Sequence, residues 1–158
     1  MTTAQSLEAA MRRALAEGGI DEVTAGGEFT LPAHRPTLFP GAIYGFAVHL
    51  DQTDLKALFD EARTRKLSRV SRLRSIHPIE GTLYPLYWGK DKYLGARPYQ
   101  HLNDPAKTGA IRLSTYKALR GKTIACVSLV VSDYGAAERI MRRVYPDMLK
   151  TSMVRRGT

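Results

Sequence analysis

Residues 87–101 read Tyr-Trp-Gly-Lys-Asp-Lys-Tyr-Leu-Gly-Ala-Arg-Pro-Tyr-Gln-His, and this stretch is the most informative part of the chain. Its first four residues are typical of the end of a β-strand. Its last part predicts a helix that begins near Arg97 and carries His101 one turn later. A phenol, an ammonium, a guanidinium and an imidazole thus lie close together along the chain. An apolar core needs none of these groups, because burying them without partners costs free energy. They suit the binding and cleavage of a phosphodiester.

Three segments of the chain predict β-strands, and one of them overlaps the start of this stretch. Residues 41–50 are rich in residues that suit a pleated surface, and so are residues 82–89 and 123–131. Proline cannot donate a backbone hydrogen bond, so Pro85 predicts an edge strand or a bulge for the second segment. We therefore expect a small antiparallel sheet of three strands.

Helices are predicted between and around these strands. Residues 4–17 form one that ends at Gly18-Gly19, and residues 20–40, which contain three prolines, form an irregular arm. After Thr53, a candidate N-cap, apolar residues recur at helical spacing, and the predicted helix continues into an arginine-rich surface. Residues 95–103 predict a short helix, and the final helix runs from Ser132 or Asp133 to Tyr145. The expected fold class is therefore α/β of the α+β type, with one domain in which helices flank the small sheet.

The charge of the chain is positive and unevenly distributed. The formal net charge is +9, and residues 61–158 carry 20 Lys and Arg against 7 Asp and Glu, whereas residues 1–60 carry 4 against 8. A one-sided positive field attracts polyanions, so nucleic acid is the first candidate partner. The alternative is a ribosome-associated or simply a soluble basic protein.

The sequence also bears on the cellular setting. No apolar run approaches the length of a membrane span, and the N-terminus lacks the apolar region of a signal peptide. The single cysteine, Cys126, lies in an apolar run and is expected to be buried. We expect a cytoplasmic protein without a membrane partner, and the oligomeric state, monomer or homodimer, stays open.

Several short motifs in a fixed order resemble those of the GIY-YIG nuclease superfamily. The first tyrosine element is Ala42-Ile43-Tyr44 and the second is Tyr87-Trp88-Gly89, followed by Arg97 eight residues later and His101 four residues after that. Glu138 lies in a segment that looks like the glutamate-bearing helix of the family. The resemblance covers residues 41–50 and 82–150 and leaves residues 1–40 and 51–80 outside.

The resemblance implies a function and a domain organisation. Residues 41–158 would form a GIY-YIG-like nuclease domain with a basic helical insertion at about 51–80, preceded by the N-terminal helix and arm of residues 1–40. The chain would be a metal-dependent DNA endonuclease, a phosphodiester hydrolase, with Glu138 anchoring Mg²⁺ or Mn²⁺. Within that class the arginine-rich insertion favours a restriction or defence enzyme, and a repair-like nicking enzyme and a DNA-degrading toxin are the alternatives. A nucleic-acid-binding protein without catalysis is the alternative outside the class.

Each candidate catalytic residue has a physical role. Tyr44 is the candidate general base for the attacking water, and Lys90 or the metal would favour its phenolate form. Tyr87 would orient that water or hold the phosphate. Arg97, near a helix N-terminus, would stabilise charge on the phosphate, and His101 would relay a proton or bind phosphate. Duplex DNA would be gripped by the basic stretch, which consists of Arg63, Arg65, Lys66, Arg69, Arg72 and Arg74.

The sequence departs from the family pattern in three ways, and simpler interpretations exist for its residues. Trp88 stands where the family prefers a branched aliphatic, 42 residues separate Tyr44 from Tyr87, and Lys150 stands where Asn is common. The tyrosines could be ordinary strand aromatics, and the basic stretch a solvated helix face. Glu138 could pair with Arg142 at i+4.

Overall fold

The computed structural model describes residues 2–24, 28–30, 42–91 and 113–151. In this part of the chain, three long strands build an antiparallel sheet: β3 (Ala42–His49), β4 (Leu83–Asp91) and β5 (Ile124–Val131). β3 lies in the middle and pairs with β4 on one side and β5 on the other. The predicted three-stranded antiparallel core is confirmed, with bounds that differ from the expected ones by one or two residues.

Two short strands extend this sheet beyond the prediction. β1 (Val23–Thr24) and β2 (Glu28–Thr30) both pair antiparallel with β5, so the described sheet has five strands. They come from the segment that the sequence assigned to an irregular arm. At two and three residues, they are too short to show the alternation that predicts a strand.

β4 is the edge strand beside β3, as Pro85 predicted. The register shifts between Phe46 and Ala47, so that Phe46 lies opposite Tyr87 and Ala47 lies opposite Pro85. Leu86 is thus the extra residue of a bulge. This bulge matters for the site because it places Tyr87 on the same sheet face as Tyr84, where both belong to one core cluster.

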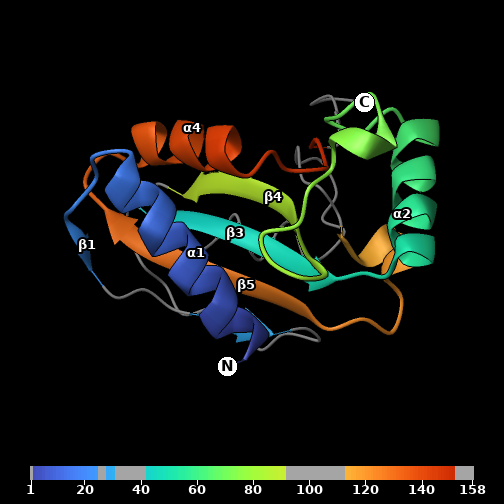
Figure 1. Ribbon diagram of the computed structural model, residues 1–158, viewed down its shortest axis with the longest axis horizontal. Coiled ribbons are helices and arrows are strands. Elements are labelled where there is room, and N and C mark those ends of the chain that lie inside the picture. Colours follow the sequence, from blue (N-terminus) through green and yellow to red (C-terminus); the bar gives the residue numbers. More distant parts are fainter. Residues whose placement is uncertain (1, 25–27, 31–41, 92–112, 152–158) are drawn as a thin grey trace, which may run out of the picture.

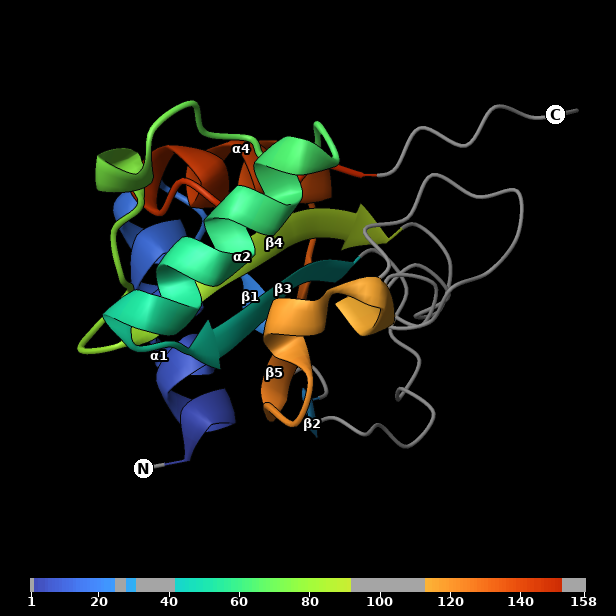
Figure 2. The same cartoon turned by 90° about the vertical axis from the view of Figure 1, so that its right-hand side faces the viewer.

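Helices cover the two faces of the sheet (Figures 1 and 2). α1 (Thr3–Glu17) and α4 (Tyr134–Val144) pack together on one face, over a core that includes Ile43 and Trp88. α2 (Gln52–Thr64) covers the other face with the short 3₁₀ turns η2 (Leu113–Thr115) and η3 (Lys117–Leu119), over a core that includes Tyr44 and Phe46. A further 3₁₀ turn, η1 (Leu73–Ser75), lies in the segment after α2. The predicted helices at the two ends of the described chain are confirmed.

The predicted course of α2 is wrong at both ends. Its N-cap is Asp51, whose side chain accepts a hydrogen bond from the backbone N–H of Asp54 at 2.7 Å, and Thr53 lies inside the helix. The helix also ends at Thr64 and does not continue through the basic stretch, so the predicted helical insertion at 51–80 is helical only at its start and at η1. Lys66 has a φ of +60° and reverses the chain direction.

Two segments of chain, residues 148–150 and then residues 67–69, lie side by side along the free edge of β4. The backbone N–H of Leu149 donates to the carbonyl of Leu86 at 3.0 Å, and the N–H of Met148 donates to the carbonyl of Pro85 at 3.3 Å. Beyond them, the N–H of Arg69 donates to the carbonyl of Met148 at 2.7 Å, and the N–H of Lys150 donates to that of Leu67 at 2.7 Å. Covering an edge in this way removes a template for pairing with other chains. Residues 148–150 thus lie directly beside the strand that carries Tyr87, and residues 67–69 lie one segment further out.

Two further expectations concern the membrane and the cysteine. In the described ranges, none of the helices has the length and apolar character that a membrane crossing requires. Cys126 is buried and carries a free thiol, as predicted, and burial raises its pKa well above the ordinary value.

Candidate functional site

The two tyrosine elements lie side by side because β3 pairs with β4. Tyr44 lies opposite Gly89, and the next position on the same face places Phe46 opposite Tyr87. The ring centroids of Tyr44 and Tyr87 are 6.4 Å apart, with an angle of 38° between the ring planes. A Cβ atom on Gly89 would overlap the hydroxyl and the ring of Tyr44. The glycine is therefore needed for the close approach of the Tyr44 phenol to the backbone of β4.

Both phenols are largely enclosed by protein. The exposed fraction is 1% for Tyr44 and 7% for Tyr87, and both side chains belong to the core cluster on the α2 face. Burial raises the pKa of Tyr87 above its ordinary value, and Arg142 opposes this shift. Tyr87 is therefore a neutral phenol at neutral pH, which suits it to donate a hydrogen bond rather than to accept a proton.

Two guanidinium groups flank the ring of Tyr87. The Cζ atom of Arg142, from α4, lies 5.3 Å from the ring centroid, and that of Arg69, from the segment after α2, lies 5.7 Å from it. Both distances are within the range of cation–π attraction. Tyr87 is therefore the point at which the sheet edge, α4 and the segment after α2 meet.

Glu138 reaches this point through Arg142. The Nη1 of Arg142 donates to Oε1 of Glu138 at 2.8 Å, and its Nη2 donates to the backbone carbonyl of Trp88. The two side chains are one helical turn apart on α4 and are half-buried, with exposed fractions of 19% for Glu138 and 27% for Arg142. The pairing of Glu138 with Arg142 is the simpler alternative that the sequence left open, and here it occurs beside Tyr87.

Asp147 lies behind these residues and is fully buried. Its Oδ2 accepts a hydrogen bond from the N–H of Trp88 at 2.9 Å and lies 3.5 Å from Nε of Arg142. Its Oδ1 lies 2.9 Å from Nε of Arg69, at an angle that does not align the N–H for a hydrogen bond. Burial raises the pKa of Asp147, and Arg69, the N–H of Trp88 and Arg142 counteract the shift without reversing it.

Lys90 lies on the other side of the sheet. It pairs with Ile43, so the alternation of a strand places it on the face opposite to Tyr44. A Cβ atom on Gly135, in the first turn of α4, would lie 4.0 Å from Nζ of Lys90. The expectation that Lys90 stands beside Tyr44 and favours its phenolate is therefore wrong. The side chain is solvent-exposed.

Arg97 and His101 lie outside the described residues, as does the helix predicted over residues 95–103. Their roles stay predictions. Lys150 lies within the described part, is exposed, and uses its backbone N–H to bind Leu67.

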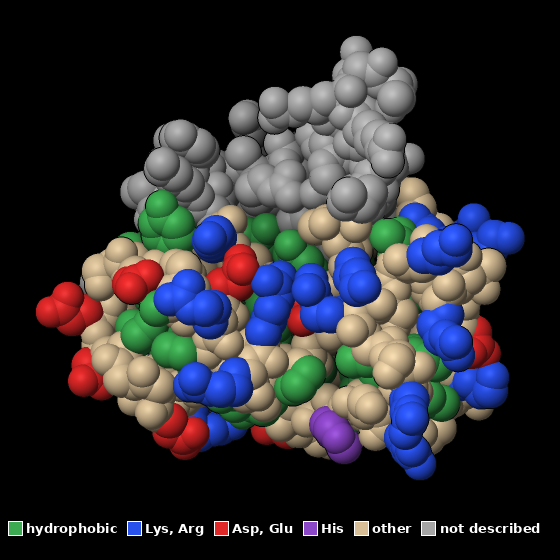
Figure 3. Space-filling model, turned by 90° about the horizontal axis from the view of Figure 1, so that it is seen from above, with side chains coloured by type: hydrophobic (Ala, Val, Ile, Leu, Met, Phe, Trp, Pro, Cys, Tyr) green, Lys and Arg blue, Asp and Glu red, His purple; other side chains and the backbone are tan. Residues whose placement is uncertain are grey.

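The basic stretch divides into two groups. Arg65 donates to the hydroxyl of Thr115 at 2.9 Å and lies 4.1 Å above the ring of Tyr116, and Arg69 is engaged with Asp147. The other members are exposed: Arg63, Lys66, Arg72 and Arg74. Figure 3 shows Lys and Arg side chains spread over the face formed by α4 and the segment after α2. The exposed group is therefore the part of the stretch that can meet a polyanion.

The chemistry of the donor atoms allows one carboxylate-bound divalent ion. In the described ranges, no three His, Cys, Asp or Glu side chains come together as a metal-binding group. The hydrogen bond to Glu138 from the described residues engages Oε1 and leaves Oε2 for another ligand. Mg²⁺ commonly binds one or two carboxylates and completes its shell with water and substrate phosphate. Glu138 fits that mode, whereas Asp147 is fully buried and already engaged.

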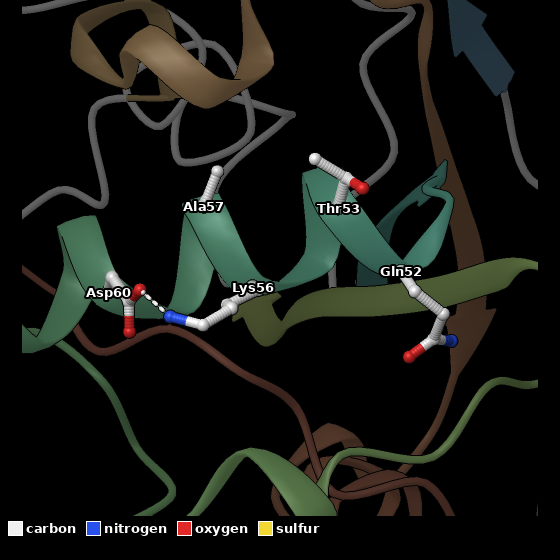
Figure 4. A pocket seen from close by; sticks show the side chains of 5 residues that line it. All are labelled: Gln52, Thr53, Lys56, Ala57 and Asp60. Atoms are coloured by element: carbon white, nitrogen blue, oxygen red, sulfur yellow. Dashed lines mark hydrogen bonds and ion pairs between the residues drawn. The ribbon is translucent and has the colours of Figure 1, made fainter.

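A shallow pocket on the outer side of α2 contains none of the candidate residues (Figure 4). Its lining comes from this one helix, and the two charged side chains in it, Lys56 and Asp60, pair with each other at 2.6 Å. It gives no reason to place a ligand there.

Sequence reasoning missed Asp147 and the central part played by Arg142. One signal was present in the sequence, because Asp147 directly precedes two apolar residues, Met148 and Leu149, which the structure buries together with it. An acidic residue beside such apolar neighbours is buried only when it is paired. Its partners come from β4 and from the segment after α2, and this pairing over long sequence separations leaves no local pattern.

Comparison of this chain with protein-family models, with curated proteins and with solved structures found no match.

Proposed function

We propose that this chain is a metal-dependent endonuclease of the GIY-YIG type that hydrolyses phosphodiester bonds in DNA. The observation that supports the proposal is that the Tyr87 ring lies beside Tyr44 of the neighbouring strand and beside Arg142, which in turn pairs with Glu138. Register pairs the two tyrosine elements, and Arg142 contacts both the Tyr87 ring and the Glu138 carboxylate.

In this proposal the residues of the chain divide the work. Tyr44 would accept the proton of the attacking water as a phenolate, a form that a bound divalent ion would favour in the absence of Lys90, and Tyr87, a neutral phenol, donates a hydrogen bond to a phosphate oxygen. Arg97 and His101 keep the roles that the resemblance implies. Lys90 lies on the opposite face of the sheet from Tyr44, so the proposal gives it DNA contact near the first turn of α4 and no part in activating Tyr44.

The divalent ion would be held by Glu138 together with water and the scissile phosphate. When bound, Mg²⁺ or Mn²⁺ supplies Lewis-acid stabilisation of the phosphoryl oxygen and the leaving alkoxide. Arg142 must share Glu138 with that ion, which leaves one carboxylate oxygen for each.

A plasmid-nicking assay with Mg²⁺ or Mn²⁺ tests the proposal. Glu138→Ala is expected to lose nicking by at least about 100-fold, because it removes the only proposed protein ligand. Glu8→Ala is the matched control, since Glu8 also forms an i,i+4 pair with an arginine on a helix, at 3.7 Å from Arg12. Equal nicking by wild type and Glu138→Ala would refute the assignment of the metal.

One observation favours a second candidate, a DNA-binding protein without catalysis. Glu138 is already paired with Arg142, and Lys150 stands where the family commonly has Asn. This candidate predicts that wild type and Glu138→Ala retain the same DNA in a gel-shift assay, and that neither nicks it with any divalent ion.

A further inference from the structure

Asp147 joins three separate parts of the molecule through one buried carboxylate. It accepts a hydrogen bond from Trp88 of β4, and it forms ion pairs with Arg142 of α4 and Arg69 of the segment after α2. Its exposed fraction is 0%. Those three parts are the ones that meet at Tyr87.

The fold does not need this carboxylate to anchor the chain around it. Four backbone hydrogen bonds already fix residues 148–150 between β4 and residues 67–69. A buried ion pair is also a weak source of stability, because the cost of desolvation offsets much of the attraction, and apolar replacements are often as stable. What the carboxylate specifically does is orient the two guanidiniums.

Those two guanidiniums would repel each other without a shared counter-charge. Arg142 and Arg69 both lie within 6 Å of the Tyr87 ring centroid, at 5.3 and 5.7 Å, so their positive charges face the same small region. Asp147 forms an ion pair with each of them, so that both positive charges can lie beside the same ring. Arg142 then has its remaining N–H groups directed to Glu138 and to the carbonyl of Trp88.

We propose that Asp147 is a positioning residue, which holds Arg142 in the orientation that links Glu138 to Tyr87, with Arg69 as the second cation that it aligns. The kinetic part of this inference rests on the proposed nuclease function. The arrangement around Tyr87 does not, and it can be measured in a protein that cleaves nothing.

The ionisation of Tyr87 is the readout that does not depend on cleavage. The absorbance of tyrosinate is followed as the pH is raised, for each protein and for the same protein with Tyr87→Phe. The difference between the two curves reports the ionisation of Tyr87 alone. In Asp147→Asn the Tyr87 pKa is expected to rise, because guanidiniums that are no longer held beside the ring favour its phenolate less. An unchanged or lower Tyr87 pKa in a folded Asp147→Asn protein would overturn the inference, because it would mean that the two guanidiniums stay beside the ring without Asp147.

Nicking kinetics give the second readout. Asp147→Asn is expected to lower kcat by about 10- to 100-fold, the usual effect of removing a group that orients a ligand of a metal, and to leave KM for DNA unchanged. A wild-type kcat in this variant would also overturn the inference. If wild type shows no cleavage, the proposed function fails, and the titration still decides the role of Asp147.

Arg69→Gln keeps the inference testable if Asp147→Asn does not fold, because Arg69 is partly exposed, at 31% of its side chain. Positioning predicts a higher Tyr87 pKa and a lower kcat, with unchanged KM. A simple phosphate grip predicts a higher KM and a weaker salt dependence of binding, with unchanged kcat, and that result would contradict positioning. Arg12→Gln is the matched control, because Arg12 lies on α1 away from the basic stretch and is also a partly exposed arginine paired with a carboxylate, at 3.7 Å from Glu8.

Discussion

At the scale of single residues, Gly89 shows most directly how the sequence sets the geometry of the site. The Tyr44 phenol occupies the space where the side chain of any other residue would lie. Gly89→Ala should therefore destabilise the fold by about 1–3 kcal/mol, the usual cost of overpacking a core. Chemical denaturation followed by the fluorescence of Trp88, the one tryptophan of the chain and fully buried, measures the change.

Gly135→Ala is the control for that measurement. The nearest atoms to a Cβ there are 3.7 Å away, and the residue lies inside α4. Alanine should stabilise this position by about 0.4–1 kcal/mol. If Gly89→Ala and Gly135→Ala lowered the free energy of unfolding equally, contact with the Tyr44 phenol would not be the cause of the loss at Gly89.

Tyr87 gives a prediction of pH dependence. Burial raises the pKa of Tyr87 in the folded state above its ordinary value. The folded state then holds its proton more tightly than the unfolded state, whose tyrosine pKa is about 10. The stability contributed by the neutral phenol is therefore complete below that pH and is lost as the pH rises through the folded-state pKa.

Denaturation of wild type and Tyr87→Phe as a function of pH checks this sign. The free energy of unfolding of wild type should fall more steeply than that of Tyr87→Phe above about pH 10, with parallel curves below it. Parallel curves throughout would show that Tyr87 titrates alike in both states.

At the scale of elements, the end of α2 explains where sequence reasoning failed. The N–H of Leu67 donates to the carbonyl of Ala62 at 2.8 Å, and the N–H of Lys66 donates to that of Arg63 at 2.9 Å. This pair of bonds is a Schellman motif, which usually has glycine at the position of Lys66. Because a lysine occupies the left-handed position, at φ +60°, the sequence carries no stop signal.

The elements that the sequence predicted well are those with a local signal. α1 ends at a glycine, α4 is followed by Pro146, and Pro85 marks the edge strand. The contacts of Asp147 and the pairing of residues 67–69 with 148–150 depend on residues far apart in sequence. They follow from how the elements pack, and no local pattern of residues specifies them.

Lys66→Gly tests the unusual helix end. It should raise the free energy of unfolding by about 1 kcal/mol, because a left-handed conformation costs a residue with a Cβ roughly that much. Lys56→Gly, inside α2, is the matched control and should lower it by about 1 kcal/mol. A loss of stability in Lys66→Gly would show that the lysine side chain, and not its backbone, stabilises this turn.

At the scale of the whole molecule, the distribution of charge decides how the protein meets a polyanion. Residues 61–158 carry 20 of the 24 Lys and Arg, yet Arg65 and Arg69 are engaged within the fold. Only cations that exchange solvent ions for phosphates contribute to the salt dependence of DNA binding. Of the six residues that the sequence predicts to bind DNA, the structure therefore leaves the four exposed ones as candidates for phosphate contact: Arg63, Lys66, Arg72 and Arg74.

Neutralising Lys66, Arg72 and Arg74 together to Gln tests this narrowing. The slope of log affinity for duplex DNA against log salt should become shallower by about 0.9 for each phosphate contact that is lost. A control triple variant, Arg12→Gln, Lys56→Gln and Arg120→Gln, removes the same charge from other elements. Its slope should stay near that of wild type, because a change of net charge alone releases no bound ions. Equal slopes in the two triple variants would mean that DNA responds to the overall charge of the protein, and that the segment after α2 makes no contact of its own.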